Sequence, residues 1–230
     1  RLASTSLSPR QLASIDAYNN ARNSRGRLED LLDILPADKD LAPDVALATP
    51  DGSNSDLMRR IQGALLIFKA GLGSAADVEL GGFDSHDAND AWQQPLFSHV
   101  ADAVEYFWDY AEELKLADRL MLVIGSDFGR TNFYNDADGK DHWPIGSYIV
   151  MENKPNWGDR VVGATDKLHF PVPINPKSLK RDRKNGVNLL PSHVHLALRK
   201  YLKLDSYAND VGFRLNVESL DLFNPKKRTV

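Results

Sequence analysis

The spacing of apolar residues along the chain predicts several helices separated by polar loops. Apolar side chains recur about one helical turn apart in four segments, residues 8–35, 56–70, 93–116 and 191–202. The third segment is the clearest, because Leu96, Val100, Phe107 and Leu114 fall on one face. Loops are expected at 36–54 and 153–190, and irregular structure is expected after residue 204.

Three short apolar runs predict strands, at residues 78–80, 120–124 and 147–151. The run at 120–124 is continuously apolar between Arg119 and Gly125, which is typical of a strand buried on both faces of a parallel sheet. A strand, the 93–116 helix and a second strand form a right-handed βαβ unit by default. The pattern therefore predicts a parallel α/β arrangement.

Composition narrows the classes of function. The 230 residues suffice for one large domain or two small ones, and 42% are hydrophobic, as in ordinary globular proteins. A net charge of −4 gives no sign of a general nucleic-acid binder. The absence of cysteine excludes disulfides, zinc–thiolate sites and a cysteine nucleophile. No apolar run reaches the roughly 18 residues of a membrane-spanning helix, so we expect no membrane span.

One segment departs from this acidic balance. Basic residues crowd the stretch 177–184, namely Lys177, Lys180, Arg181, Arg183 and Lys184. A solvated surface loop is the favoured interpretation, because runs of like charge usually face water. A patch that binds an anion or a partner is the alternative.

Three motifs combine acidic residues, histidine and glycine. They are Gly81-Gly82-Phe83-Asp84-Ser85-His86, Gly125-Ser126-Asp127-Phe128-Gly129-Arg130-Thr131 and Gly139-Lys140-Asp141-His142-Trp143. The first two follow predicted strands, and the third precedes one. Carboxylate oxygens and imidazole nitrogens gathered where strands end are the donors that a hydrolytic metal site needs.

The first motif supplies a candidate pair of ligands. On a strand, Asp84 and His86 point to the same side because they are two residues apart. Gly81 and Gly82 permit a bulge or a close approach of the backbone before them. The alternative is a surface Asp-Ser-His turn that holds no ligand.

The second and third motifs add further candidates. Asp127 lies just past the carboxyl end of the 120–124 run, where the sites of open α/β sheets cluster. Arg130 carries a planar fork of donors that suits a phosphate or sulfate, or else it neutralises a nearby acid such as Asp127. His142 is a candidate imidazole ligand. The polar stretch 135–140 before it suits a cation loop in composition but lacks the EF-hand register.

The other histidines are interpreted as structural. His193 and His195 lie two residues apart in the last predicted helix, so they face different directions. We expect His193 to be exposed or in the first turn and His195 to pack. We assign no chemistry to His99, on a predicted helix, or to His169, in a loop.

Several well-known catalytic motifs are absent from the sequence. The chain has no GxSxG elbow, no GxxxxGK[ST] loop, no GxGxxG turn and no HExxH helix. Their absence argues against serine-triad hydrolases, P-loop enzymes, Rossmann dehydrogenases and zincin proteases.

Taken together, the motifs resemble those of a large family of exported bacterial proteins of unknown function within the alkaline phosphatase and sulfatase superfamily. Residues 82–86 match Gly-Phe/Trp-Asp-Thr-His, with Ser85 in place of Thr. Residues 126–131 match Ser-Glu/Asp-Phe-Gly-Arg-Thr, residues 139–143 match Gly-x-Asp-His-Trp/Gly, and residues 163–166 match Gly-x-Thr-Asp. The resemblance covers roughly residues 55–205, including the closing helix, and rests on the order and spacing of the motifs.

The resemblance implies an α/β fold with a doubly wound, mostly parallel sheet flanked by helices, of the alkaline phosphatase type. It treats residues 1–230 as a single domain, the carboxyl-terminal portion of a larger fold that lacks its amino-terminal part. That missing segment of the same protein is an expected partner, and the chain alone is expected to be poorly soluble or molten. A periplasmic or otherwise exported location is implied, although no signal peptide is visible.

The resemblance also implies a set of site residues. Asp84, His86, Asp127 and His142 are the implied ligands of one or two divalent metal ions, with zinc, manganese and calcium as candidates. Arg130 is the implied contact for an oxyanion. In the superfamily the catalytic nucleophile lies in the amino-terminal part that is expected to be missing here. Within this chain, Thr131 and Ser126 are the remaining candidates for the nucleophile.

Two functions are compatible with these residues. The first is a metal-dependent hydrolase of phosphate or sulfate esters that acts on a small anionic ester substrate. The second is a non-catalytic exported binding or structural protein that retains the fold. The clustered acids and histidines favour the first. Phe128 favours the second, because the active metallohydrolases usually carry histidine after the second carboxylate.

Overall fold

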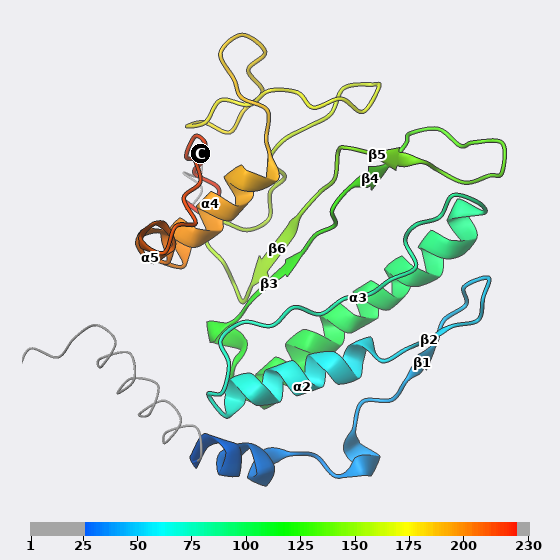
Figure 1. Ribbon diagram of the computed structural model, residues 1–230, viewed down its shortest axis with the longest axis vertical. Coiled ribbons are helices and arrows are strands. Elements are labelled where there is room, and N and C mark those ends of the chain that lie inside the picture. Colours follow the sequence, from blue (N-terminus) through cyan, green and yellow to red (C-terminus); the bar gives the residue numbers. More distant parts are fainter. Residues whose placement is uncertain (1–25, 225–230) are drawn as a thin grey trace, which may run out of the picture. The chain divides into compact units, whose positions relative to one another are not determined.

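The computed structural model describes residues 26–224 and contains two compact units, which divide between Ala117 and Asp118 (Figure 1). Residues 8–25 of the first predicted helix lie outside the described residues, and residues 26–34 are helical as predicted. A short 3₁₀ helix, η2 (Ala117–Arg119), spans the division. The prediction of a single domain stays a prediction.

The first unit is built on two helices, α2 (Leu57–Lys69) and α3 (Asn89–Glu113). Both confirm the predicted helices, with α3 beginning four residues earlier than expected. The connection 70–88 runs back along α3, so the two helices point in the same general direction (Figure 1). Lys69 Nζ near the end of α2 donates to the Leu114 carbonyl just after α3 at 2.9 Å, which agrees with this direction.

Apolar side chains from these helices form the core of the first unit. The buried members are Leu57, Leu65, Leu66, Leu96, Ala103, Phe107 and Ala111. One buried polar side chain, Gln62, fastens the preceding segment to α2. It donates to the Asp40 carbonyl at 3.1 Å and accepts from the Ala42 amide at 2.9 Å. These bonds satisfy the buried amide group and fix the chain after η1 (Asp38–Asp40).

The strands of the first unit differ from those predicted. The predicted strand at residues 78–80 is wrong, because this segment is part of the loop before α3 and Val78 is exposed. A short antiparallel pair lies instead in the expected loop 36–54 and just after it. It consists of β1 (Val45–Ala46) and β2 (Asn54–Ser55), with Val45 opposite Ser55.

The second unit contains two further antiparallel pairs and two helices. The pair β3 (Met121–Ile124) with β6 (Ile149–Glu152) confirms the two later predicted strands. The short strands β4 (Gly129–Arg130) and β5 (His142–Trp143) form the other pair. Helix α4 (Pro191–Tyr201) confirms the last predicted helix, whereas α5 (Asp205–Asp210) lies in the tail that was expected to be irregular.

The expected parallel pairing is wrong for the two longest strands. Ile124 lies opposite Ile149 and Met121 opposite Glu152, so β3 and β6 are antiparallel. A parallel pair needs a crossover of a dozen or more residues, usually a helix, and the chain between β3 and β6 instead turns back through β4 and β5. Val123 and Ile149 are exposed, so these strands are not buried on both faces. The described residues therefore form a mixed α/β structure with small antiparallel sheets.

The core of the second unit draws on α4 and on the segments before and after it. Its buried members are Trp157, Val172, Ile174, Val194, Leu196, Ala197 and Leu220. The Trp157 indole N–H donates to the Tyr201 hydroxyl at 3.2 Å, and that hydroxyl donates to Glu152 of β6 at 2.8 Å. This chain of bonds joins α4 to the edge of the sheet.

Within the described residues, no helix has both the length and the apolar character that crossing a lipid bilayer requires. The longest, α3, carries many charged side chains along its 25 residues and includes Pro95 in its interior. This agrees with the expected absence of a membrane span.

Candidate functional site

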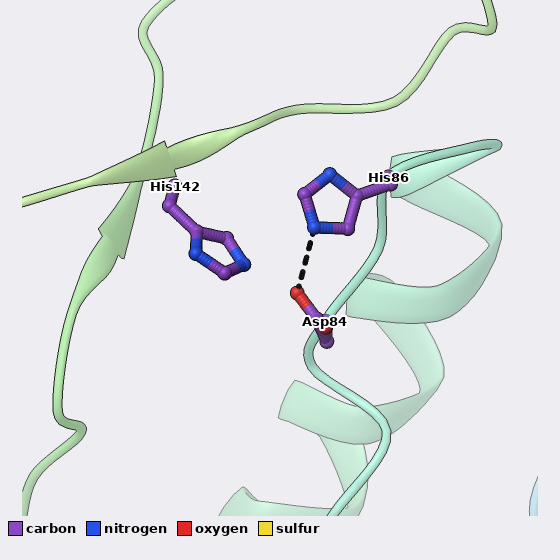
Figure 2. A group of neighbouring side chains, drawn as sticks. All are labelled: Asp84, His86 and His142. Atoms are coloured by element: carbon purple, nitrogen blue, oxygen red, sulfur yellow. Dashed lines mark ion pairs between the residues drawn. The ribbon is translucent and has the colours of Figure 1, made fainter.

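Asp84 and His86 form a candidate pair of metal ligands, His142 is a further candidate ligand, and all three side chains are exposed (Figure 2). Asp84 and His86 belong to the loop before α3 in the first unit. His142 belongs to β5 in the second unit. All three are among the four ligands that the sequence resemblance implies.

A buried serine organises the loop that carries Asp84 and His86. Ser85 is 2% exposed, and its hydroxyl donates to Asn89 Oδ1 at 2.9 Å in the first turn of α3. The Gln93 side chain donates both to the Ser85 hydroxyl and to the Phe83 carbonyl, each at 2.9 Å. Ser85 is buried, whereas the side chains on either side of it, Asp84 and His86, are exposed to solvent.

Asp84 and His86 face each other across this serine. His86 Nε2 lies 3.1 Å from Asp84 Oδ1, as the dashed line in Figure 2 shows. The Asp84 side chain is 66% exposed and the His86 side chain is 48% exposed, so solvent reaches both side chains. The two amides at 85 and 86 each bond to the carbonyl two residues earlier, which makes two consecutive tight turns. The sequence therefore predicted the convergence of this pair, although a turn rather than a strand produces it.

Gly82 brings the same loop against α3. Its φ of +94° suits glycine, and a Cβ built there would lie 3.2 Å from Cδ1 of the buried Leu96. Phe83 then packs edge-on against Phe97, with ring centroids 5.3 Å apart. The first motif is thus tied to α3 by an apolar contact on one side and by Ser85 on the other.

His142 lies in a sheet pair that stacks it on an aromatic ring. Arg130 and His142 are directly opposite in the β4–β5 ladder, so their side chains share one face. Phe128 precedes Arg130 by two residues and shares that face. Its ring stacks on the imidazole with centroids 4.0 Å apart and an angle of 30°. Within the second unit, Phe128 thus holds one face of the His142 ring.

Arg130 is fixed against the same ring. Its guanidinium carbon lies 5.6 Å from the Phe128 centroid, and Nη1 donates to the Lys140 carbonyl at 3.0 Å. Gly129 beside it is required by a close approach, because a Cβ there would overlap the Ile145 carbonyl oxygen. Arg130 is therefore half-buried and oriented by β4.

Asp127 and Ser126 satisfy the turn that leads into β4. Asp127 Oδ1 accepts from the Phe128 amide at 3.1 Å, and the Ser126 hydroxyl donates to the Phe128 carbonyl at 2.7 Å. Both residues are exposed. The predicted role of Asp127 as a metal ligand stays a prediction.

Thr131 is buried in the β4–β5 hairpin. Its hydroxyl donates to the Phe133 carbonyl at 2.8 Å and accepts from the Asp141 amide at 3.3 Å, and its own amide donates to the Asp141 carbonyl. Asn135 closes the turn beyond it by accepting from the amides of Ala137 and Gly139. These bonds give Thr131 and the 135–140 loop a structural task, and the predicted catalytic role of Thr131 stays a prediction.

Two of the other histidines, His193 and His99, are buried and hydrogen-bonded, which the sequence did not indicate. His193 lies in the first turn of α4, as one option stated, but it is 2% exposed, whereas His195 is exposed. The Leu190 amide donates to His193 Nδ1 at 2.9 Å, so Nε2 carries the proton that meets Glu218 at 3.2 Å. His99 is equally buried, and its Nε2 lies 2.9 Å from the Ser55 hydroxyl.

A family match covers most of the chain. Residues 1–185 match a family described as "Protein of unknown function (DUF1501)". The chain belongs to this family. No curated protein and no solved structure matches the chain significantly. The family's description names no sulfatase or alkaline phosphatase, and its match takes in all three acid–histidine motifs.

Proposed function

We propose that this DUF1501 chain is a metal-dependent hydrolase of phosphate or sulfate esters, of the sulfatase and alkaline phosphatase type. The observation that supports it most is the Asp84–His86 pair, with a carboxylate oxygen and an imidazole nitrogen 3.1 Å apart on an exposed, well-anchored loop. Two donors at this separation fit a single ion. The order of the three motifs along the chain supplies the remaining proposed ligands, Asp127 and His142.

The proposed donors favour particular metals. Two imidazole nitrogens with one or two carboxylates suit zinc or manganese, because borderline and first-row ions accept mixed nitrogen and oxygen ligands. Calcium prefers oxygen alone and takes six to eight such ligands. Of the three candidate metals, zinc and manganese are therefore proposed ahead of calcium.

The chain's own groups would bind and orient the ester. A bound divalent ion would polarise the ester oxygen and lower the pKa of an attacking hydroxyl or water. Arg130 would supply fixed positive charge for the anionic group, because its planar fork matches the oxygens of a phosphate or sulfate. The stack on Phe128 and the bond to the Lys140 carbonyl hold this charge in place before substrate arrives.

Metal content and affinity test the first step of the proposal. Zinc and manganese would be titrated into the full chain, with Asp84→Asn, His86→Ala and His142→Ala beside wild type. Each variant is expected to bind at least about tenfold more weakly, because each removes a ligand. His195→Ala is the matched control, since His195 is exposed on α4 and not among the proposed ligands. Equal affinity in all five proteins would contradict a metal site at these motifs.

Turnover tests the second step. Aryl phosphate and aryl sulfate esters would be offered to the metal-loaded protein. We expect hydrolysis of one class and its loss in Arg130→Gln with metal affinity unchanged, because Arg130 acts on the anion rather than on the metal. Stoichiometric metal binding without turnover of either ester would reject the hydrolase and keep the metal site.

A non-catalytic exported binding or structural protein is the second candidate. Phe128 favours it, because active metallohydrolases of the superfamily usually carry histidine after the second carboxylate, whereas here an apolar ring at that position stacks on His142 with centroids 4.0 Å apart. In that case the same side chains form a polar network around a structural ion. Location outside the cytoplasm is part of both proposals, and fractionation of the producing cells tests it.

A further inference from the structure

The loop before α4 presents five cationic side chains to solvent without pairing them. Lys177, Lys180, Arg181, Arg183 and Lys184 are all exposed. Among residues 26–224, none of these five side chains takes part in a hydrogen bond or an ion pair. We call residues 175–186 the basic loop. It follows β6 and precedes α4 in the chain (yellow to gold in Figure 1).

The backbone of the basic loop is rigidly built. It starts from Ile174, which is 1% exposed and bridges both Arg181 and Val187. The Ile174 and Val187 backbones exchange two hydrogen bonds of 2.9 Å, and the Asp182 amide donates to the Pro173 carbonyl at 2.8 Å. Glycine is required at position 186, because a Cβ there would overlap the Asp182 carbonyl oxygen. The cations therefore project from a preformed frame.

Two polar side chains of the basic loop, Asn175 and Asp182, bond to its backbone amides, and the cationic side chains extend into solvent. Asn175 Oδ1 accepts from the amides of Lys177 and Ser178 at 3.1 Å each. Asp182 Oδ1 accepts from the amides of Lys184 and Asn185, and the Asn185 bond is the main reason that the pKa of Asp182 is lowered. Asp182 is the acid of the loop, and it is engaged with backbone amides rather than with the cations.

We propose that the basic loop binds the anionic surface of a phospholipid membrane. Five cations on one rigid loop are enough for electrostatic attraction to acidic headgroups. The donors are spread over an exposed loop rather than converging in a pocket, so the loop suits a charged surface better than a single phosphate ion. The hairpin 165–171, which leads into Ile174, exposes Leu168 and Phe170 and adds the apolar contact that an interfacial site uses.

A nucleic acid is the less suitable polyanion. Proteins that hold single strands place aromatic rings for base stacking among their cations. The basic loop, residues 175–186, contains no aromatic residue. The net charge of −4 gives no sign of a general attraction between the chain and polyanions.

Vesicle sedimentation with the full chain tests the proposal. Phosphatidylglycerol–phosphatidylcholine vesicles would be compared with phosphatidylcholine alone at low and high salt. The test variant is Lys177→Gln, Lys180→Gln, Arg183→Gln and Lys184→Gln together. The control variant is Lys39→Gln, Lys115→Gln, Lys154→Gln and Lys203→Gln, which removes the same charge at exposed positions elsewhere.

Binding to anionic vesicles is expected, with release at high salt and a loss of about fivefold per charge removed from the loop. The test variant then binds roughly a hundredfold or more weakly, and the control variant stays within a few-fold of wild type. Unchanged cooperative thermal unfolding shows that the test variant is folded.

Four outcomes would overturn the proposal. Three of them are no binding of wild type to anionic vesicles, equal loss in the two variants, and tighter binding to duplex DNA than to the vesicles at equal salt. Release of the protein from vesicles by millimolar inorganic phosphate at constant ionic strength would indicate a small-anion site and also reject the membrane. Metal-stripped protein is expected to bind vesicles as well as loaded protein, so the result is independent of the hydrolase.

Discussion

In the first unit the buried side chains of α2 and α3 are mostly apolar, whereas in the second unit polar side chains bonded to backbone hold much of the chain between β6 and α4. Leu65, Leu96 and Phe107 illustrate the first case. Asn175 and Asp182 illustrate the second, each accepting from two backbone amides. The first unit is therefore stabilised mainly by apolar burial, and the loops of the second unit by hydrogen bonds from side chains to backbone. The two kinds of interaction should lose different amounts of free energy when a side chain is removed.

The largest expected effect is in the first unit. Leu96→Ala removes a 1%-exposed side chain that packs in the α3 core and against Gly82. The cavity should lower the free energy of unfolding by about 3 kcal/mol, measured by urea denaturation. Ile67→Ala on α2 is the control, because Ile67 is exposed and should cost less than about 1 kcal/mol. Similar losses in the two variants would contradict an apolar core centred on Leu96.

A smaller effect is expected from the polar frame of the second unit. Asn175→Ala removes the acceptor of two amides in the basic loop and should cost about 1 kcal/mol. Urea denaturation measures the loss, and faster amide exchange at Lys177 and Ser178 locates it. Asn188→Ala, at an exposed position outside the loop, is expected to change neither quantity. A loss as large as that of Leu96→Ala would remove the contrast between the two units.

A buried histidine of the first unit, His99, should make the stability of that unit depend on pH. Burial lowers the pKa of His99 below its ordinary value of 6.5, and the charge of Asp102 opposes this shift. The unfolded chain therefore binds more protons than the folded chain in mildly acidic solution. The contribution of His99 to stability is complete above about pH 6.5 and falls as the pH decreases from 6.5 toward the folded pKa.

Urea denaturation between pH 8 and pH 5 measures this contribution. His99→Gln keeps a polar group near the Ser55 hydroxyl but cannot be protonated. Its unfolding free energy should fall less steeply below pH 6.5 than that of wild type. Parallel pH profiles for the two proteins would show that His99 does not titrate differently in the folded state.

The smallest effect on stability is expected at the aromatic stack of the second unit. Phe128→Ala leaves the β4–β5 ladder in place and should change the unfolding free energy by less than about 1 kcal/mol. If His142 binds metal as proposed, zinc affinity should fall several-fold, because the imidazole loses the ring at 4.0 Å that orients it. If His142→Ala weakens zinc binding but Phe128→Ala does not, the stacked ring does not position the imidazole for the metal.

Local patterns predicted local structure well. The helices α2, α3 and α4 and the strands β3 and β6 were foreseen, because each contains enough apolar residues to show its own period. The direction of the β3–β6 pair was not, because it depends on how the intervening residues turn back rather than on the strands themselves. The two-residue strands were missed because such short segments have no period.

The candidate site was predictable only in part, for the same reason. Asp84 and His86 are near neighbours in sequence, and their convergence followed from that spacing. The sequence did not predict that His193 is buried and His195 exposed, because the residues that pack against α4 decide which of its faces is buried. One of the contacts of His193 is with Glu218, 25 residues away in the sequence. The stack of Phe128 on His142 likewise depends on the register of β4 and β5, which the sequence does not display.

Pro95 interrupts the backbone hydrogen-bond ladder of α3. A proline has no amide hydrogen, so the Ala91 carbonyl receives no bond from that position and the first turn of the helix is coupled weakly to the rest. The Ser85 hydroxyl is hydrogen-bonded to Asn89 and Gln93, and both of these residues lie before Pro95 in the helix. In hydrogen-exchange terms, the turn that carries Asp84 and His86 should open in rare local events while the remainder of α3 stays protected. Solutes would then meet this pair in two interconverting forms, closed against the helix or briefly released.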